Sequence, residues 1–401
     1  MLTPTEAETE TLKRMPQWPS KTCPLLEAHG RILRQSIHTD RDLPPFDRVT
    51  MDGYALRATD LTPDQRTFKI QGVQAAGMRP AELSEELGVC VEIMTGAVLP
   101  VGADCVVPYE ETTRTADSMT ISDQTTLEMG NIVHPRGSDY SKGALVVEAG
   151  TRLTGREIAV AASCGGATLH VTKQPKIAVV STGDELVEVD AIVAPHQVRR
   201  SNDYALRAAL ISAGYPDVSR FLLHDMKHEI EHQLWHILEE FDVVLLTGGV
   251  SKGKFDYLPE VLESLEVKKV FQGIAQRPGK PFWFGIGPRQ VAVFALPGNP
   301  VSAYTCLHRY ALPALAKASG LPLTSPRTIR LESVVTFKPP LARLMPVELI
   351  DQGDGTQLAR PLSTNTSGDF GGLVHTDGFV ELPADQSEFP AGTVANYWSW
   401  V

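Results

Sequence analysis

The chain has 401 residues, of which 42% are hydrophobic and 21% charged, with a net charge of −11. This composition is that of an ordinary folded protein, and the length predicts about two to four domains. The acidic balance argues against general nucleic-acid binding. No run approaches the roughly 18 apolar residues of a membrane span. We therefore expect neither a nucleic-acid nor a membrane partner.

The N-terminus and the cysteines both indicate a cytoplasmic protein. The start, Met1-Leu2-Thr3, has no basic residues and no apolar run, so no signal peptide is expected. The five cysteines are odd in number and include no C-x-x-C pair. That pattern is typical of reduced, buried thiols.

The first 164 residues combine short helices with a β-rich stretch. Residues 22–34 carry apolar side chains on one side of a possible helix, and two prolines make 41–47 extended. Residues 52–150 alternate short apolar runs with Gly-, Pro- and Thr-rich turns, which predicts a β-rich unit with a hairpin at 112–126. A further helix is expected over 154–164.

From residue 176 the pattern alternates strand and helix, which predicts a parallel, doubly wound α/β domain. Ser201–Asp203 can cap a helix. The expected elements are strand 176–181, a helix from 202 to 212, helix 226–240, strand 242–247, helix 257–264, strand 291–296 and helix 301–319. After Pro326 only short strands with turn signals are expected, at 329–337, 346–350, 357–361, 378–382 and 393–397, which fit a small antiparallel β domain or barrel.

Three glycine-bearing loops carry most of the functional signal: Thr247–Asp256, Arg277–Pro281 and Leu296–Pro300. The first and third follow apolar runs, and a glycine loop beyond a strand can point several backbone N–H groups at an anion. Residues 174–323 have a net charge of only −1, so an acidic ligand meets little repulsion there. Basic side chains lie in or beside the loops, namely Lys252, Lys254, Arg277 and Lys280. We predict a site for a phosphorylated or oxyanionic ligand.

Carboxylates follow the expected strands as well. The carboxyl ends of parallel strands share one edge of a sheet, so these acids should gather there. Carboxylate oxygens bind Mg²⁺, which completes its shell with water and phosphate oxygens. For any single acid, helix capping or solvation is about as good an explanation. The acids are Asp184, Glu185, Asp225 and Asp256.

A histidine ladder offers an alternative. His224, His228, His232 and His236 recur every four residues, and His228–His232 matches the H-E-x-x-H pattern of zinc peptidases. No third histidine follows at the usual spacing and the helix is highly charged. We interpret the ladder as a solvated helix face.

The sequence of segment 43–55 is too constrained for a flexible linker. We expect an extended segment that places Asp47 and Asp52 at a specific position, which the residues alone do not identify. Together with later motifs it resembles the molybdopterin molybdenumtransferases of the MoeA type and the E domain of gephyrin. The matching segments, which run in order over about 22–401, are Pro44–Asp47 with Met51–Ala55, Thr95–Ala97 with Gly102–Asp104, Ser181–Leu186, Ser201–Asn202, Gly248–Ser251, Asp256, Pro278–Pro281, Leu296–Ala303 and Ser367–Asp369.

The resemblance implies an elongated multidomain homodimer of α/β plus β class. A discontinuous N-terminal linker domain (1–45 with 143–173) would surround an inserted β-rich domain (46–142). A doubly wound molybdopterin-binding α/β domain (174–323) and a C-terminal β-barrel (324–401) would follow. The active cleft would lie between the α/β domain of one subunit and the N-terminal region of the other, so that Asp52 could reach the partner's site.

The resemblance also implies an activity in molybdenum cofactor biosynthesis. Adenylylated molybdopterin would be cleaved with Mg²⁺ while molybdate is inserted into the dithiolene, releasing AMP. A separate molybdopterin adenylyltransferase would supply the substrate and apo molybdoenzymes would accept the product. Tungstate in place of molybdate stays open, as does a scaffolding role, because gephyrin also clusters receptors.

Residue roles are carried over position by position. The implied catalytic residues are Asp52, Glu185, Asp225 and Asp256, the last three also as metal ligands. The implied substrate-binding residues are Thr95, Asp139, Thr182, Gly183, Asp184, Gly248, Gly249, Ser251, Pro297, Gly298 and Asn299. The implied molybdate-binding residues are Arg277, Lys280, Ser302, Arg343 and Ser367. Arg277 stands where many members of the family have lysine, which keeps the charge but changes its geometry.

Overall fold

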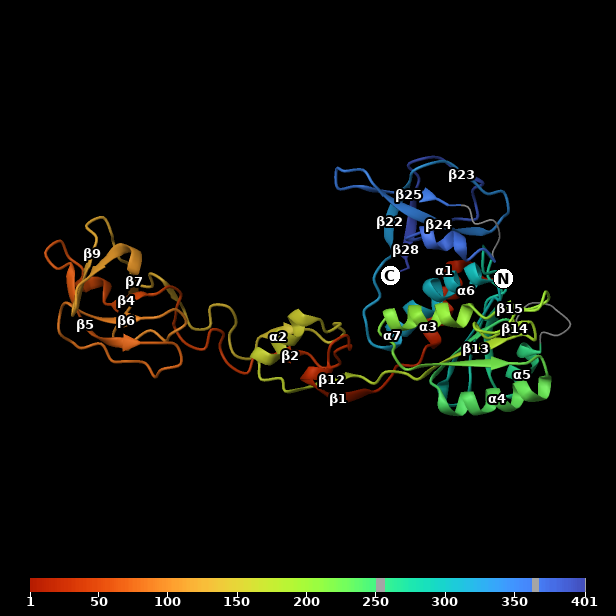
Figure 1. The fold of residues 1–401 in the computed structure, drawn as a ribbon, viewed down its shortest axis with the longest axis horizontal. Helices are drawn as coiled ribbons and strands as arrows, with labels where there is room; N and C mark the ends of the chain where they lie inside the picture. The colour runs from red at the N-terminus through yellow and green to blue at the C-terminus, as the bar shows by residue number, and fades with distance from the viewer. Residues whose placement is uncertain (250–256, 363–367, 401) are drawn as a thin grey trace.

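A computed structural model describes residues 1–249, 257–362 and 368–400. The molecule is elongated (Figure 1). A β-rich unit occupies one end, a small linker with short paired strands lies in the middle, and an α/β unit with a β-barrel above it forms the other end. Among the described residues, no helix is long and apolar enough to cross a membrane.

The β-rich unit at the far end is built on one six-stranded sheet in the order β7-β4-β6-β5-β9-β8. The expected hairpin at 112–126 is present as β8 and β9. Fully buried side chains such as Tyr54 and Phe68 fill its core. The strands are β4 (Gly53–Leu56), β5 (Thr67–Gln74), β6 (Val89–Ile93), β7 (Cys105–Pro108), β8 (Thr112–Arg114) and β9 (Ser118–Ile121).

The linker joins segments from both sides of the β-rich unit through three two-stranded pairs. These are β1 (Ser20–Pro24) with β12 (Thr168–Thr172), β2 (Ile37–His38) with β11 (Leu145–Val147), and β3 (Arg48–Val49) with β10 (Val133–His134). The helix α2 (Gly155–Ser163) agrees with the one expected over 154–164.

The prediction of a helix over residues 22–34 is wrong. The segment is instead β1 followed by a short 3₁₀ turn, η1 (Leu25–Glu27). Pro24 lacks a backbone donor and disfavours a helical residue before it, while Gly30 adopts a positive φ of 76°. Long-range pairing with β12 therefore prevails over the apolar periodicity.

The α/β unit has a six-stranded sheet in the order β16-β13-β17-β21-β20-β18. The first four strands are parallel to one another, and β20 and β18 add an antiparallel edge. The strands are β13 (Ile177–Thr182), β16 (Val218–Leu223), β17 (Val243–Thr247), β18 (Lys268–Gln272), β20 (Trp283–Ile286) and β21 (Ala292–Leu296). A short parallel pair, β14 (Leu186–Val187) with β15 (Val198–Arg199), lies beyond β13.

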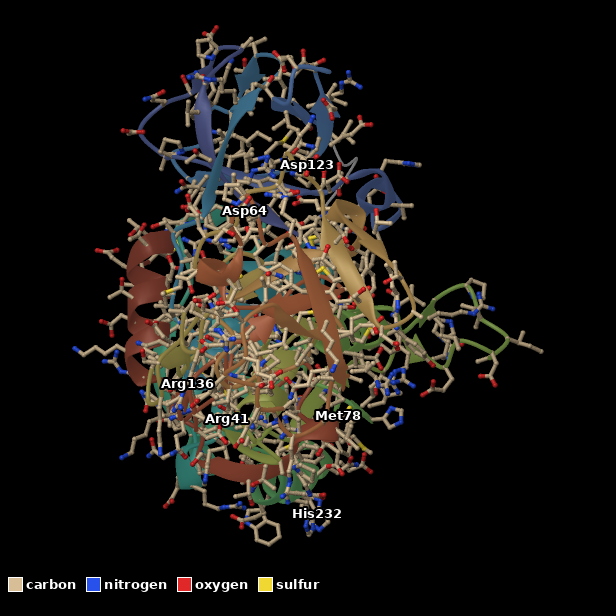
Figure 2. All side chains as sticks on the ribbon, turned by 90° about the vertical axis from the view of Figure 1, so that its left-hand side faces the viewer. Arg41, Asp64, Met78, Asp123, Arg136 and His232 are labelled. Atoms are coloured by element: carbon tan, nitrogen blue, oxygen red, sulfur yellow. The ribbon has the colours of Figure 1, made fainter. Side chains whose placement is uncertain are left out.

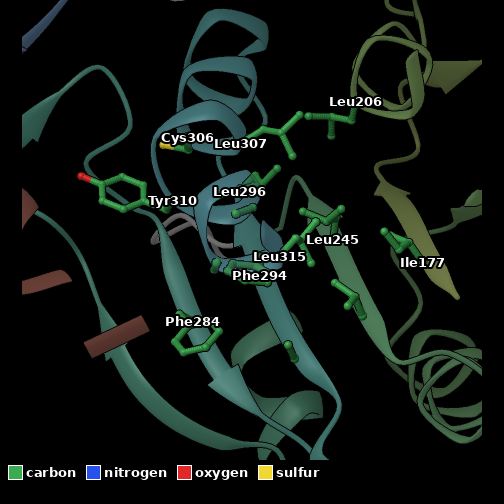
Figure 3. Close-up of a cluster of buried hydrophobic side chains, with 14 of the residues drawn as sticks. Ile177, Leu206, Leu245, Phe284, Phe294, Leu296, Cys306, Leu307, Tyr310 and Leu315 are labelled. Atoms are coloured by element: carbon green, nitrogen blue, oxygen red, sulfur yellow. The ribbon is translucent and has the colours of Figure 1, made fainter. Parts of the chain in front are cut away.

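Helices cover both faces of this sheet, which is why its strands are continuous apolar runs. Along β13, Ile177 and Val179 join one core cluster and Ala178 and Val180 the other. The first cluster, shown in Figure 3, includes the ring of Phe294 and the helix residues around Leu307. One face of the sheet is covered by α3 (Asn202–Ser212) and by a long helix. The long helix consists of α6 (Pro300–Cys306), the π-helical η5 (Leu307–Ala311) and α7 (Leu312–Ala318). The other face is covered by α4 (Lys227–Glu240) and α5 (Leu258–Ser264).

The N-terminal helix α1 (Pro4–Arg14) packs on the α/β unit although it begins the chain. Thr3 caps it with a reciprocal capping box to Glu6. Ala7, Met15 and Trp18 belong to the same buried cluster as β13 and β21. The first nineteen residues therefore pack with the α/β unit, whereas the expected division groups them with the linker. The domain boundaries at 45, 142, 173 and 323 stay predictions.

The C-terminal unit closes into a five-stranded barrel. The strand order is β24-β25-β22-β28-β26, and β26 pairs back with β24. The short strand β19 (Gln276–Arg277), from the α/β unit, joins this sheet alongside β24. The barrel strands are β22 (Arg327–Leu331), β24 (Ala342–Asp351), β25 (Gln357–Pro361), β26 (Gly378–Leu382) and β28 (Val394–Ser399), and a separate pair is β23 (Val335–Thr336) with β27 (Glu388–Phe389).

Candidate functional site

Two glycine loops and the turn after β13 meet at the carboxyl edge of the parallel strands. Gly248 follows β17, and a Cβ there would lie 2.7 Å from the carbonyl oxygen of Thr182 at the end of β13. A Cβ on Gly249 would lie 2.9 Å from the Thr182 hydroxyl, and one on Gly298, which follows β21, would lie 3.4 Å from the Cα of Gly248. Gly248 and Gly249 therefore need to be glycine for the loop after β17 to approach Thr182 this closely, while the loop at Gly298 lies in ordinary contact beside them.

Asn202, the first residue of α3, fastens this edge. Its Nδ2 donates to the Thr247 hydroxyl at 2.9 Å and to the Gly298 carbonyl at 2.7 Å. Its Oδ1, like the Thr182 hydroxyl oxygen, is buried without a hydrogen-bond partner in the described part of the chain. Buried polar atoms normally have partners, so these two are candidate ligand contacts. Asn202 was expected as part of a helix cap and of the motif Ser201–Asn202, without a role at the site; that role depends on contacts with residues 45 and 96 positions away, which the sequence pattern does not carry.

Three acids expected at the site lie at the same edge. The Asp184 carboxylate accepts the backbone N–H of Asp225 at 3.1 Å and lies 3.4 Å from Nδ1 of His224. The Glu185 carboxylate folds over Gly183, because a Cβ on that glycine would lie 2.5 Å from Oε2. The structure thus brings Asp184, Glu185 and Asp225 together at the turn beyond β13.

These acids would supply only part of the ligands that a hard cation such as Mg²⁺ requires. Within the described residues, no group of three or more His, Cys, Asp or Glu side chains could hold a metal ion. Mg²⁺ usually takes one or two protein carboxylates and keeps water and phosphate oxygens for its other positions. The carboxylates of Glu185 and Asp225 are donors of that kind.

The third loop leads directly into the long helix. Pro297 is buried, and Asn299 is the exposed N-cap residue of α6, whose carbonyl accepts the N–H of Ala303 at 2.9 Å. Ser302 lies in the first turn of that helix and is 4% exposed. Free N–H groups at such a helix start favour a negative charge.

The two expected arginines lie side by side across the seam between the α/β unit and the barrel. In the β19–β24 pairing, Arg277 is directly opposite Arg343. Neither forms an ion pair within the described residues. Burial, and to a smaller extent the like charge of Arg277, lowers the pKa of Arg343. Two guanidinium groups held together without a carboxylate suit an anion that both can bind.

The loop that carries Arg277 and the exposed Lys280 packs against buried side chains. A Cβ on Gly279, whose φ is 92°, would lie 2.5 Å from Sγ of Cys306 and 2.6 Å from Nε2 of Gln276. Gln276 is fully buried, and its Oε1 accepts the hydroxyl of Tyr310. Gln276 and Tyr310 were not expected at the site, because no local motif indicates them.

Three expected residues lie elsewhere in the molecule. Asp52 and Thr95 are hydrogen-bonded to each other in the β-rich unit, at the opposite end of the chain from β13 and β17 (Figure 1). Asp139 lies 3.0 Å from His134 Nε2 near the linker. A single chain therefore does not bring these three to the edge of the α/β sheet.

Other expectations lie outside the described residues, namely Ser251, Asp256 and Ser367, together with Lys252 and Lys254. Of the histidine ladder, His228, His232 and His236 lie on the exposed face of α4, whereas His224 precedes the helix; Figure 2 shows His232 at the molecular surface. His232 and His236 have ring centroids 4.8 Å apart. Because the described residues offer no third ligand, the zinc-peptidase alternative gains no support.

Fold and site define the class: a multidomain α/β protein with glycine loops at the carboxyl edge of its parallel sheet and an arginine pair at the junction with a β-barrel. Three family models match in order: "MoeA N-terminal region (domain I and II)" over residues 2–165, "Probable molybdopterin binding domain" over 178–317, and "MoeA C-terminal region (domain IV)" over 328–400. Together they cover most of the chain, which belongs to the MoeA family of molybdopterin molybdenumtransferases.

Individual relatives support the same family assignment. The chain is 40% identical over 374 residues to the molybdopterin molybdenumtransferase of Synechocystis sp., covering 93% of each chain. It is 30% identical to that of Staphylococcus epidermidis, covering 92% of this chain and 88% of the relative. A solved molybdopterin biosynthesis MoeA protein from Pyrococcus horikoshii superposes with a TM-score of 0.83 at 25% identity, covering all of both chains.

Proposed function

We propose that this chain performs the last step of molybdenum cofactor synthesis. Adenylylated molybdopterin is cleaved with release of AMP while molybdate is inserted into its dithiolene. The observation that carries the proposal is the juxtaposition of Arg277 and Arg343, neither of which forms an ion pair within the described residues, beside the glycine-loop edge. Molybdate is a tetrahedral dianion, and two planar guanidinium groups can each offer it a pair of donors.

The remaining residues take roles that fit this reaction. Gly248, Gly249 and Gly298 let backbone groups approach the phosphates, and Thr182 and Asn202 offer buried polar atoms to the ligand. Lys280 and Ser302 add a charge and a hydroxyl for the oxyanion. Glu185 and Asp225 would hold Mg²⁺, which when bound neutralises charge on the phosphates.

Asp52, Thr95 and Asp139 enter this proposal through a second copy of the chain. They lie in the β-rich and linker units, remote from the α/β edge of the same chain. A homodimer in which this region covers the partner's edge would supply them. We further propose that the protein works in the cytoplasm, receives its substrate from a separate molybdopterin adenylyltransferase and passes the product to apo molybdoenzymes.

The test is reconstitution with purified protein, adenylylated molybdopterin, Mg²⁺ and molybdate. We expect molybdate-dependent release of AMP and activation of an apo molybdoenzyme. Arg277→Met and Arg343→Met should lose the molybdate dependence, while Arg360→Met, an exposed arginine on the barrel, should behave as wild type. Tight binding of the adenylylated pterin without release of AMP would overturn the proposal and favour a binding or scaffolding role.

A further inference from the structure

The long helix after the third glycine loop contains one π-helical stretch, Leu307–Ala311, between α6 and α7. Such stretches occur often at functional sites because they redirect side chains within a continuous helix. Here three successive residues are all buried and contact different parts of the molecule. Nε2 of His308 lies 3.1 Å from the carbonyl oxygen of Trp400. Tyr310 contacts the α/β side of the seam at which Arg277 and Arg343 meet, and Arg309 contacts its barrel side.

Tyr310 holds the α/β side of the seam. Its hydroxyl donates to Oε1 of Gln276, the residue before Arg277. Gln276 is fully buried, and its Nε2 lies 3.7 Å from Sγ of Cys306, one helical turn before Tyr310. The backbone that carries Arg277 is thereby tied to the π-helical stretch.

Arg309 holds the barrel side. It is 2% exposed, and its Nε donates to Oε2 of Glu381 at 2.7 Å. Its Nη1 lies 3.0 Å from Oε2 of Glu8 on α1, and its guanidinium lies 4.4 Å from the ring centroid of Trp398. Glu381 is opposite Leu344 in the β24–β26 pairing, one position from the Arg343–Leu382 pair, so Arg309 holds the strand pair that carries Arg343 from the opposite face of the sheet.

The direct pairing between the two sides is short. β19 contributes only Gln276 and Arg277 to the seam, and the second of its two register pairs sets like charges opposite each other. Like charges opposite each other in a sheet are unfavourable. Contacts away from the arginines must therefore keep the barrel against the α/β unit at this point.

We propose that Arg309 and Tyr310 are positioning residues that set the separation of the Arg277 and Arg343 guanidinium groups and so fit the pair to a tetrahedral oxyanion. The inference rests on the proposed function, because it concerns the same oxyanion. It adds two residues that touch neither molybdate nor pterin and act through Gln276 and Glu381.

The test separates molybdate use from pterin binding. For Tyr310→Phe, which loses one buried hydrogen bond, we expect the KM for molybdate to rise about tenfold, and for Arg309→Met, which loses the contacts with both Glu381 and Glu8, by at least as much. The kcat at saturating molybdate and the Kd for adenylylated molybdopterin should stay close to the wild-type values. Arg309→Lys, which keeps the charge, should recover part of the loss. Leu331→Ala, a cavity in the barrel core away from the seam, controls for general destabilisation and should leave the KM unchanged.

Crystal structures of the same variants supply a readout that does not depend on activity. The distance between the Cζ atoms of Arg277 and Arg343 should change in Tyr310→Phe and Arg309→Met and stay as in wild type in Leu331→Ala. An unchanged distance, or an equal KM increase in Leu331→Ala, would overturn the inference. If the wild-type chain shows no molybdate-dependent turnover, the proposed function fails, while the distances still decide whether these residues position the pair.

Discussion

The carboxylate of Asp52 accepts two hydrogen bonds from Thr95. Its Oδ1 accepts the backbone N–H of Thr95 at 2.6 Å and the Thr95 hydroxyl at 2.7 Å. These bonds, the backbone one foremost, lower the pKa of Asp52 below its ordinary value of 3.8. Thr95 was expected as a substrate contact, but its hydroxyl is engaged with Asp52. An aspartate kept ionised and fixed in direction fits the role that we propose for Asp52 at the site of a second copy of the chain.

Thr95→Val should raise the pKa of Asp52. The hydroxyl bond favours the ionised form, so its loss moves the pKa upward, and the retained backbone bond keeps the change partial. Because the folded-state pKa is the depressed one, the charge on Asp52 would then be lost at a higher pH as the solution is acidified. Carboxyl ¹³C NMR of the full chain with labelled aspartate measures the shift, and Asp52→Asn assigns the signal.

The barrel supplies a matched control for this prediction. Asp354 accepts the backbone N–H and the hydroxyl of Thr356 in the same arrangement, and these bonds, the hydroxyl one foremost, lower its pKa. Thr356→Val should raise the pKa of Asp354 and leave turnover unchanged. Thr95→Val should shift the acid limb of the activity profile to higher pH. Equal activity profiles for both variants would show that Asp52 takes no part in the reaction.

Gly279→Ala should disable the loop that carries Arg277 and Lys280. The new Cβ would overlap Sγ of Cys306 and Nε2 of Gln276, and an alanine would be held at a φ of 92°. Overpacking and the strained backbone together should cost about 2–4 kcal/mol. We expect a lower urea midpoint and a higher KM for molybdate.

Gly392→Ala isolates the backbone part of that effect. Gly392 has a φ of 82° but no atom within 4 Å of its virtual Cβ. Its cost should be about 1–2 kcal/mol with turnover intact. A Gly279→Ala protein with the stability and KM of the Gly392→Ala protein would contradict the steric argument.

Asn202→Ala should weaken binding of the adenylylated pterin. The change removes both donors that link α3 to Thr247 and Gly298, so the third loop loses its attachment to the first. Isothermal titration should show an affinity lower by about one order of magnitude, as expected for lost hydrogen bonds at a buried edge. Asn131→Ala, which also removes an amide donor to a backbone carbonyl but lies in the β-rich unit, should bind the pterin like wild type.

The cysteines should be unreactive in the native protein. All five are buried and free, and burial raises the pKa of Cys90 to about 12. A thiol whose pKa is raised stays protonated at neutral pH and is a poor nucleophile. A thiol reagent should therefore titrate almost none of them in the folded chain and all five in guanidinium. Rapid labelling of the folded protein would contradict the packing.

The sequence predicted the elements whose signals are local. Strands β13, β17 and β21 are uninterrupted apolar runs because both faces of the sheet are covered, and each glycine loop carries its own turn residues. The antiparallel edge was missed because β18 begins with two lysines and β20 contains Gly285, so neither has a clear strand pattern. Residues 22–34 were misassigned because pairing with β12 outweighs the periodicity.

At the site, too, residues in local motifs were predicted and residues brought together by long-range contacts were not. Arg277 and the glycines were predicted from motifs, whereas Gln276 and Tyr310 meet across 34 residues. The Arg309–Glu381 contact spans 72 residues. Side chains that only support a site from other elements leave no spacing in the sequence, so they become visible only when the fold brings them together.

Asp203→Ala should destabilise the α/β unit strongly. Asp203 is fully buried in α3, and its Oδ2 accepts from Arg200 and, at 2.9 Å, from Arg220. Arg200 is 5% exposed, so removing the carboxylate takes away the buried counter-charge of this guanidinium and leaves it only the half-exposed Glu188. Breaking a buried pair in this way costs about 3–5 kcal/mol. Urea unfolding of the full chain measures it.

An exposed ion pair provides the comparison. Arg289 and Glu239 lie 3.4 Å apart, with side chains that are 52% and 50% exposed. Water screens this pair, so Glu239→Ala should cost less than about 1 kcal/mol. Arg200 also bonds Glu188 on the segment that follows Glu185, so Asp203→Ala should weaken substrate binding as well as stability, whereas Glu239→Ala should change neither. Equal unfolding midpoints for the two variants would show that the buried cluster contributes no more than a surface pair.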